Sequence, residues 1–205
     1  MTMKFFYGPR TCALASRIAL EEAGASYEPV KVDFASGEQT KPAYLAVNPK
    51  GRVPALVTDR GVLTENVAIL AFVAQSYPEK NLAPLNDPFA FAEMQAFNSY
   101  LASTVHVNHA HKHRGARWAT EESSFLDMRR KVPETMAASF RLIENDFFRG
   151  PWVMGEAYTV ADAYLFVVSR WLEGDGVDVN LFPKVADHMK RMAERPAVKA
   201  ALAGE

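Results

Sequence analysis

The chain has 205 residues, of which 49% are apolar and 23% are charged, and its formal net charge is −1. This length suits one large or two small domains, and the near-neutral charge gives no electrostatic reason to expect nucleic acid or an anionic membrane as a partner. No apolar run approaches 18 residues, the N-terminus does not resemble a signal peptide, and one cysteine cannot form an internal disulfide. We therefore expect a cytoplasmic protein.

The first 76 residues mix strand and helix patterns. Helical spacing of apolar residues runs over 12–24, 41–46 and 65–75, and strands are expected over 3–7, 27–32, 54–58 and 62–63. The first strand, helix and second strand imply a parallel pair with a right-handed crossover. Residues 59–61 read as the turn of a hairpin between the last two strands.

The rest of the chain reads as helical. Prolines at 78, 84 and 88 mark a linker over 79–87. This predicts an α/β domain over 1–78 and an all-helical domain over 88–205. Its helices are expected over 89–118, 124–148, 160–172, 184–194 and 197–203. Thr159 and Asp162 form a variant of the capping box, which we interpret as structural.

Cys12 lies where the first strand turns into the first helix. A thiol at a helix N-terminus faces unpaired N–H groups and the positive end of the helix dipole, so we expect its pKa to fall below about 8.5. Such a thiol is a nucleophile or a redox group. The alternative is a small, buried and inert apolar residue.

Two further segments can bind a peptide-like ligand. A cis Val53–Pro54 bond would turn the amide and carbonyl of Val53 outward, so that an extended ligand could pair with them, whereas an ordinary trans proline would have no such role. Thr64, Glu65 and Asn66 lie at a strand-to-helix junction, where N–H groups bind a carboxylate and Glu65 can accept from an ammonium. Plain helix capping by Thr64 or Asn66 explains the same residues and is compatible with binding.

Five segments, in this order and spacing, resemble the glutathione S-transferase superfamily, most closely the bacterial beta class: residues 7–12, 48–54, 64–69, 101–106 and 159–166. The resemblance covers essentially the whole chain. It implies a thioredoxin-like N-terminal domain with a mixed four-stranded sheet, an all-helical C-terminal domain and a homodimer. It also implies a glutathione site on the first domain and an apolar co-substrate site between the domains.

The resemblance also assigns roles in the N-terminal domain. Cys12 matches the cysteine that contacts the glutathione sulfur. Val53 matches the residue whose backbone pairs with the cysteinyl part of glutathione, before a cis-proline that matches Pro54. Glu65 and Asn66 match the pair that holds the γ-glutamyl end, although the family usually has Ser or Gly in place of Asn66.

In the helical domain, Ser103 and His106 match residues that line the active site, and Ser103 is expected to reach across the dimer. The chain departs from the family at Val107, where Lys is frequent, and at Ser99, where Asn is frequent. These departures concern the polar surroundings of the thiol and leave the class unchanged.

Tyr7 is a rival thiol activator, because many superfamily members use a tyrosine at the end of the first strand. It can instead point into the core. We prefer Cys12, and we expect Ser16 on the surface of the first helix. Trp171 and the other tryptophans are expected in the core.

Four of the five histidines lie between residues 106 and 113. His106, His109 and His113 share a helix face with a spacing that can bind zinc or nickel. No nearby acid or cysteine in the sequence completes a site, so we expect no metal. His106 is instead expected to hydrogen-bond a thiol or water. The other histidines would line the cleft or face solvent, and the run can suit an anionic electrophile.

The sequence thus predicts a glutathione transferase that activates the glutathione thiolate for attack on a small hydrophobic electrophile. A second possibility is glutathione-dependent thiol–disulfide exchange, or peroxidase activity, through a Cys12 mixed disulfide. A third is a non-enzymatic glutathione-binding or interaction module. The identity of the electrophile is not encoded in any motif.

Overall fold

The computed structural model describes residues 3–204. These form two compact units, one from the described residues up to Phe91 together with those from Ala193 onward, and one from Ala92 to Met192. No helix within the described part of the chain is long and apolar enough to cross a bilayer.

The first unit is built on a mixed four-stranded sheet in the order β2-β1-β3-β4. β1 (Met3–Tyr7) pairs in parallel with β2 (Tyr27–Lys31), while β3 (Ala55–Thr58) runs antiparallel to both β1 and β4 (Gly61–Thr64). The predicted parallel pair and the predicted hairpin are both confirmed. With the helical second unit, this is the expected thioredoxin-like domain followed by an all-helical one.

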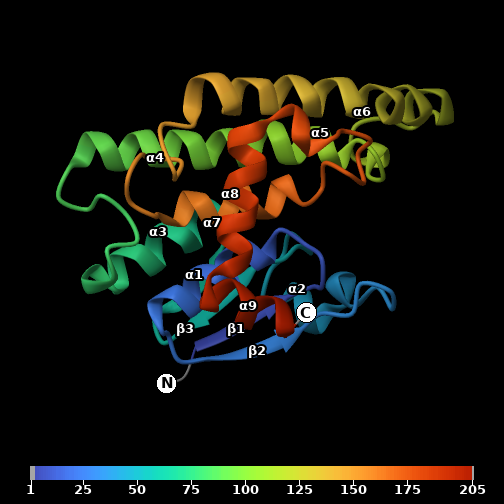
Figure 1. The fold of residues 1–205 in the computed structure, drawn as a ribbon. Helices are drawn as coiled ribbons and strands as arrows, with labels where there is room; N and C mark the ends of the chain where they lie inside the picture. Colours follow the sequence, from blue (N-terminus) through green and yellow to red (C-terminus); the bar gives the residue numbers. More distant parts are fainter. Residues whose placement is uncertain (1–2, 205) are drawn as a thin grey trace. The chain divides into compact units, whose positions relative to one another are not determined.

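Side chains of β1 alternate between the two faces of the sheet. Phe5 is fully buried and lies parallel to the ring of Tyr7, while Phe6 contacts Tyr44 of α2 (Pro42–Leu45) with 5.8 Å between ring centroids. The face of the sheet that carries Phe5 is covered by α1 (Ala13–Ala23) and α3 (Asn66–Ser76), which lie side by side (Figure 1). The expected helices 12–24 and 65–75 thus form nearly as predicted.

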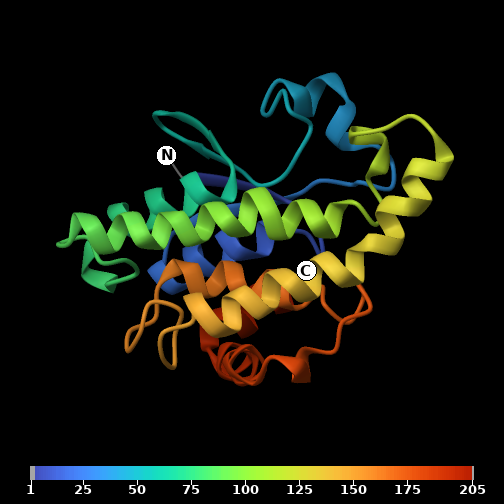
Figure 2. The same cartoon turned by 90° about the horizontal axis from the view of Figure 1, so that it is seen from above.

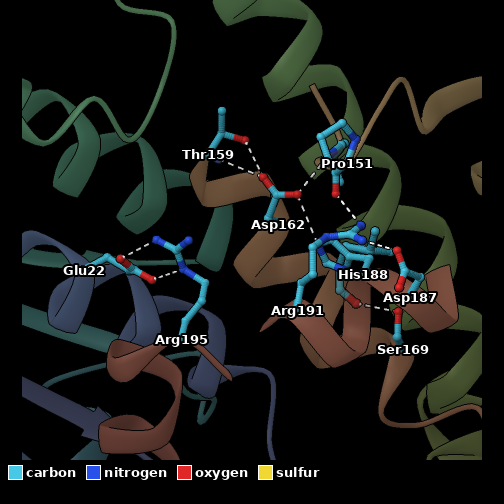
Figure 3. A network of polar contacts seen from close by, with 11 residues as sticks. Glu22, Pro151, Thr159, Asp162, Ser169, Asp187, His188, Arg191 and Arg195 are labelled. Carbon is cyan, nitrogen blue, oxygen red and sulfur yellow. Dashed lines mark hydrogen bonds and ion pairs between the residues drawn. The ribbon is translucent and has the colours of Figure 1, made fainter. Parts of the chain in front are cut away.

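The C-terminal helix α9 (Pro196–Ala203) returns to this unit and packs on α1. Beyond its end, the carbonyl of Gly204 accepts hydrogen bonds from the Tyr7 hydroxyl at 3.0 Å and from Arg17 Nη1 at 2.6 Å. Arg195 also donates to Glu22, with Nη2 2.9 Å from Oε2 (Figure 3). As a result α1 is covered almost all round, and Glu21 and Glu22 alone among its residues keep intermediate exposure.

The second unit begins with an interrupted helix. The structure has α4 (Pro88–Tyr100), a π-helical turn (Leu101–Val105) and α5 (His106–Ala110) where the sequence predicts one helix over 89–118. The predicted end is therefore wrong. α6 (Glu122–Leu142) lies against α5 (Figure 2), where Asn108 Nδ2 donates to Ser139 Oγ at 3.0 Å.

The core of this unit is α7 (Val160–Ser169), in which every residue is buried. The capping box predicted from Thr159 and Asp162 is confirmed, because the Asp162 carboxylate accepts from the Thr159 N–H at 2.8 Å. It also accepts from the Val153 N–H at 2.8 Å and contacts His188 Nε2 of α8 (Pro183–Glu194) at 3.1 Å (Figure 3).

Candidate active site

Cys12 occupies the N-cap position of α1, as the strand-to-helix pattern predicts. Its Sγ lies 3.6 Å from the carbonyl oxygen of Val53 and donates a weak hydrogen bond to it. The Val53–Pro54 peptide is cis, in agreement with the resemblance, and precedes β3. The fold therefore brings the thiol and the Val53 backbone together from positions 41 residues apart.

The expectation of a lowered thiol pKa is wrong. The pKa of the Cys12 thiol is raised to about 12, first by burial of the sulfur and second by the negative charge of Glu65. Hydrogen bonding by the Cys12 backbone and the Asn66 side chain, and the charge of Arg52, act in the opposite direction but are weaker. Cys12 as a whole is only partly buried, but loss of hydration at the sulfur outweighs the field of the helix N-terminus. The thiol is therefore protonated at neutral pH.

Asn66 is buried, and its side chain connects the start of α3 to the start of α1. Its Nδ2 donates to the Cys12 carbonyl at 2.8 Å, and its Oδ1 accepts from the Ser16 hydroxyl at 2.6 Å. Ser16 is fully buried, so the prediction of a surface position is wrong. The side chain of Asn66 thus fixes the start of α1 relative to the start of α3.

Glu65 is the N-cap residue of α3 and has a φ of 74°. This is a left-handed conformation that residues other than glycine seldom adopt, and such strain is common at ligand sites. The Glu65 carboxylate is largely exposed and forms an ion pair with Lys50, whose Nζ also donates to Thr64 Oγ1 at 2.8 Å. The first N–H groups of α3 have no partner within the helix and can bind a carboxylate.

Tyr7 does not take part in the contact between Cys12 and Val53, because its side chain is held by other residues of the same unit. The Tyr7 hydroxyl donates to Gly204, and the Arg17 guanidinium lies over the Tyr7 ring, 4.9 Å from its centroid. The tyrosine expected as a rival activator is thus engaged by the end of the chain.

Ser103 and His106 lie in the second unit, at the π-helical turn and at the first residue of α5. Ser103 is exposed, and His106 packs at an angle on Trp171, with 5.0 Å between ring centroids. A π-helical turn adds a residue to a helical turn and is frequent at functional sites. Trp171 is only half-buried, which differs from the expected core position.

Sequence reasoning missed Asp175. Its carboxylate is fully buried and its Oδ2 lies 2.7 Å from Nδ1 of His109. Nothing in the sequence links residues 66 positions apart, and the Gly174-Asp175-Gly176 segment reads as an ordinary turn. His111 points elsewhere and meets Trp118 edge-on. Among residues 3–204, no three His, Cys, Asp or Glu side chains gather as metal ligands.

Comparison with known proteins defines the class. Residues 1–75 match the family model of the glutathione S-transferase N-terminal domain, and residues 116–196 match that of the C-terminal domain. Glutathione S-transferase GstA of Escherichia coli O157:H7 is 36% identical over 206 residues, which cover 99% of this chain and 98% of that protein. The chain belongs to the glutathione S-transferase family, and its enzyme class is glutathione transferase.

Solved structures agree. A glutathione transferase homologue from Sulfitobacter, determined with bound glutathione, is 51% identical with a TM-score of 0.96, and the match covers 99% of this chain and 98% of that one. A bacterial beta class glutathione S-transferase from Sphingomonas chungbukensis is 32% identical with a TM-score of 0.85, over 98% of both chains.

Proposed function

We propose that residues 1–78 bind glutathione as an extended peptide. The backbone of Val53 pairs with its cysteinyl part beside Pro54, and Glu65, Asn66 and the first N–H groups of α3 hold its γ-glutamyl end. The Glu65 carboxylate receives the ligand ammonium, in exchange for part of its contact with Lys50. The helix N-terminus receives the ligand carboxylate. The Sulfitobacter homologue with bound glutathione supports this proposal.

Cys12 then acts as a hydrogen-bond donor to the glutathione thiolate. The observation that carries this role is the raised pKa of its thiol, because a protonated thiol can donate and a thiolate cannot. In the structure the same thiol donates to the Val53 carbonyl, at the place where the cysteinyl part of the ligand would pair. Turning this donor to a sulfur anion stabilises the attacking form of the substrate.

The helical domain, residues 88–205, provides the site for a small hydrophobic electrophile. Ser103 and His106 line it, Ser103 from the partner subunit of a homodimer. His106 lies against the half-buried indole of Trp171, so an imidazole and an aromatic surface adjoin. We propose further that the protein works in the cytoplasm.

Two alternatives fit less well. Thiol–disulfide exchange through Cys12 requires a thiolate, which the raised pKa disfavours at neutral pH. A non-enzymatic module has no need of Cys12, Val53 and Glu65 arranged together. The transferase therefore explains the site best.

The first experiment is calorimetric titration of the purified, reduced protein with glutathione. We expect saturable binding with one ligand per chain. Glu65→Gln should weaken it, whereas the matched control Glu79→Gln, on an exposed turn of the same unit, should not. No binding at millimolar glutathione would overturn the proposed function.

Assays of conjugation and of disulfide exchange with a Cys12→Ala variant separate the two possible roles of Cys12, hydrogen-bond donor and covalent nucleophile. We expect Cys12→Ala to retain part of the conjugation activity and to lose any disulfide exchange, because only exchange requires a covalent bond to the residue. Equal loss of both activities would contradict the assignment of Cys12 as a hydrogen-bond donor.

A further inference from the structure

Lys50 places an ammonium at the carboxylate that we assign to the amine of the ligand. Its Nζ forms an ion pair with Glu65 and also donates to Thr64 Oγ1 at 2.8 Å. The ammonium of a lysine and that of a γ-glutamyl group are alike, because both are cations with three N–H donors. The two ammonium groups therefore compete for the same carboxylate.

The backbone of Lys50 belongs to a turn that buried side chains hold in place. Asn48 is 1% exposed, and its Oδ1 accepts from the Lys50 N–H at 3.2 Å while its Nδ2 donates to the Arg52 carbonyl at 2.6 Å. The hydroxyl of Tyr44, which is also buried, donates to the same carbonyl at 2.7 Å. The lysine side chain thus reaches Glu65 from a fixed starting point.

The ion pair between Lys50 and Glu65 is open to solvent, so a ligand can exchange it. The two side chains are 43% and 61% exposed. An ion pair this exposed shifts an equilibrium constant by about fivefold at most. A ligand ammonium that replaces Lys50 at Glu65 gains little, since one such pair is lost for the one that forms. A ligand without the ammonium loses little, since the original pair remains.

We propose that Lys50 stands in for the ligand ammonium, so that the site also accepts thiol peptides whose N-terminal acyl group carries no amine. This inference rests on the proposed function, in which Glu65 receives the ammonium of glutathione. With an amine-free ligand the pair of Lys50 and Glu65 stays intact. It keeps the Glu65 carboxylate neutralised beside the carboxylate that the ligand brings to the start of α3. Lys50 is thus a residue that determines specificity.

A direct attraction between Lys50 and the ligand predicts something different. The lysine could bind a ligand carboxylate itself, and its loss would then weaken every anionic ligand alike. As a competitor for Glu65, its loss should instead strengthen the binding of glutathione and leave an amine-free ligand without any gain. The two roles therefore differ in the sign of the effect on glutathione.

The test compares glutathione with glutaryl-cysteinylglycine, which is glutathione without its amino group. Both would be titrated calorimetrically into the wild type and Lys50→Met, which keeps the apolar stem. The wild type should bind the two ligands within about threefold of each other, because a pair at Glu65 exists in both complexes. Lys50→Met should bind glutathione up to about fivefold more tightly and glutaryl-cysteinylglycine no more tightly, so that the ratio of the two Kd values grows.

Three further variants separate this competition from a general effect of charge. Lys80→Met removes an exposed lysine from the turn Pro78–Lys80 of the same unit and should keep the wild-type ratio. Lys50→Arg retains the cation and should also keep it. In a Glu65→Gln background, Lys50→Met should no longer tighten glutathione, because the carboxylate for which the two ammonium groups compete is gone.

Each contrary result has its own meaning. Weaker binding of both ligands by Lys50→Met, or an unchanged ratio, would overturn the role of Lys50 and leave the glutathione site intact. A wild type that binds glutathione but not glutaryl-cysteinylglycine at millimolar concentration would do the same. A wild type that binds neither would overturn the proposed function and this inference with it. If the double variant fails to fold, Lys50→Met alone still decides the question.

Discussion

The Cys12 thiol shows how a nearby charge and burial can outweigh a helix N-terminus. A helix dipole stabilises an anion by at most about 2 kcal/mol, whereas burial of an unpaired anion shifts a pKa by several units. Burial and the charge of Glu65 act together here and hold the thiol in its neutral form. The residue that sequence reasoning presents as a nucleophile is therefore better suited to donate a hydrogen bond.

The rate of alkylation of Cys12 at different pH values measures the pKa of its thiol directly. The rate at which iodoacetamide modifies Cys12 should rise about tenfold per pH unit from pH 7 to 9.5, because the thiolate fraction is far from saturation below a pKa of about 12. Mass spectrometry of the modified protein gives the rate. A rate that is half-maximal near pH 8.5 and levels off towards pH 9.5 would mean that the thiol has an ordinary pKa.

Glu65→Gln should speed this alkylation at any pH in that range, since it removes the second-largest cause of the raised pKa. Burial remains, so the rate should still climb with pH and not level off. Glu79→Gln is the matched control and should behave as the wild type. Equal rates for all three proteins would exclude an effect of the Glu65 charge on the thiol.

The burial of Ser16 shows a limit of prediction from sequence patterns. Apolar spacing identified α1 correctly, but it assigned Ser16 to the surface because a polar residue normally faces solvent. In the structure α3 and α9 both pack on α1, and Asn66 gives the buried Ser16 hydroxyl a partner. The partner lies 50 residues away, so no local signal could have shown it.

At the scale of elements, Asp162 joins three segments of the helical unit. Its carboxylate caps α7 through Thr159, accepts from the Val153 N–H and contacts His188 of α8. A local capping box was predictable from four residues of sequence. Its contact with α8 was not, because His188 lies 26 positions away on another helix.

We expect Asp162→Ala to lower the free energy of unfolding by about 3–5 kcal/mol, because it leaves buried donors without acceptors. Urea unfolding followed by circular dichroism would measure it. Asp178→Ala is a suitable control, since this exposed carboxylate caps a short turn through the Asn180 N–H and should cost less than about 1 kcal/mol. Equal losses for the two variants would contradict a central role for Asp162.

The interrupted helix after Tyr100 shows a different limit of prediction. Phe97, Leu101 and Val105 keep the apolar spacing of one continuous helix, and all three are buried. The π-helical turn inserts an extra residue without breaking that pattern, and α5 ends after Ala110, between His109 and Lys112, which both contact Asp175 in the turn after α7. The helical character of this segment was thus predictable from apolar spacing, whereas the π-helical turn and the end of the helix were not.

The last helix depends on a different long-range contact. Arg17 and Tyr7 both bind the Gly204 carbonyl at the end of α9. We expect Arg17→Met, which keeps most of the apolar stem, to increase amide hydrogen exchange across Pro196–Ala203 several-fold. Arg60→Met, in the exposed turn between β3 and β4, is the control and should leave α9 unchanged. Unaltered exchange in Arg17→Met would show that packing on α1 alone holds the helix.

At the scale of the whole molecule, the order of strands and helices was predictable because strand and helix periods differ and because crossovers have one hand. The packing of α9 on α1 in the first unit was not predictable, because no pattern in residues 196–203 indicates α1 as the partner. The homodimer likewise follows from no pattern in the sequence, and we propose it from the resemblance to the family. The exposure of Ser103 on its π-helical turn is compatible with a partner's use of it.

Mixed dimers test that proposal. If Ser103 serves the partner's site, a heterodimer of Cys12→Ala and Ser103→Ala subunits contains one site with both native residues and one with neither. Co-expression with two affinity tags would isolate it, and calorimetry should find one glutathione site per dimer with wild-type affinity. Each single-variant homodimer should bind about fivefold more weakly, the loss of roughly 1 kcal/mol of hydrogen bonding. A heterodimer without any wild-type site would place Ser103 in its own subunit's site, and failure to isolate a heterodimer would refute the dimer.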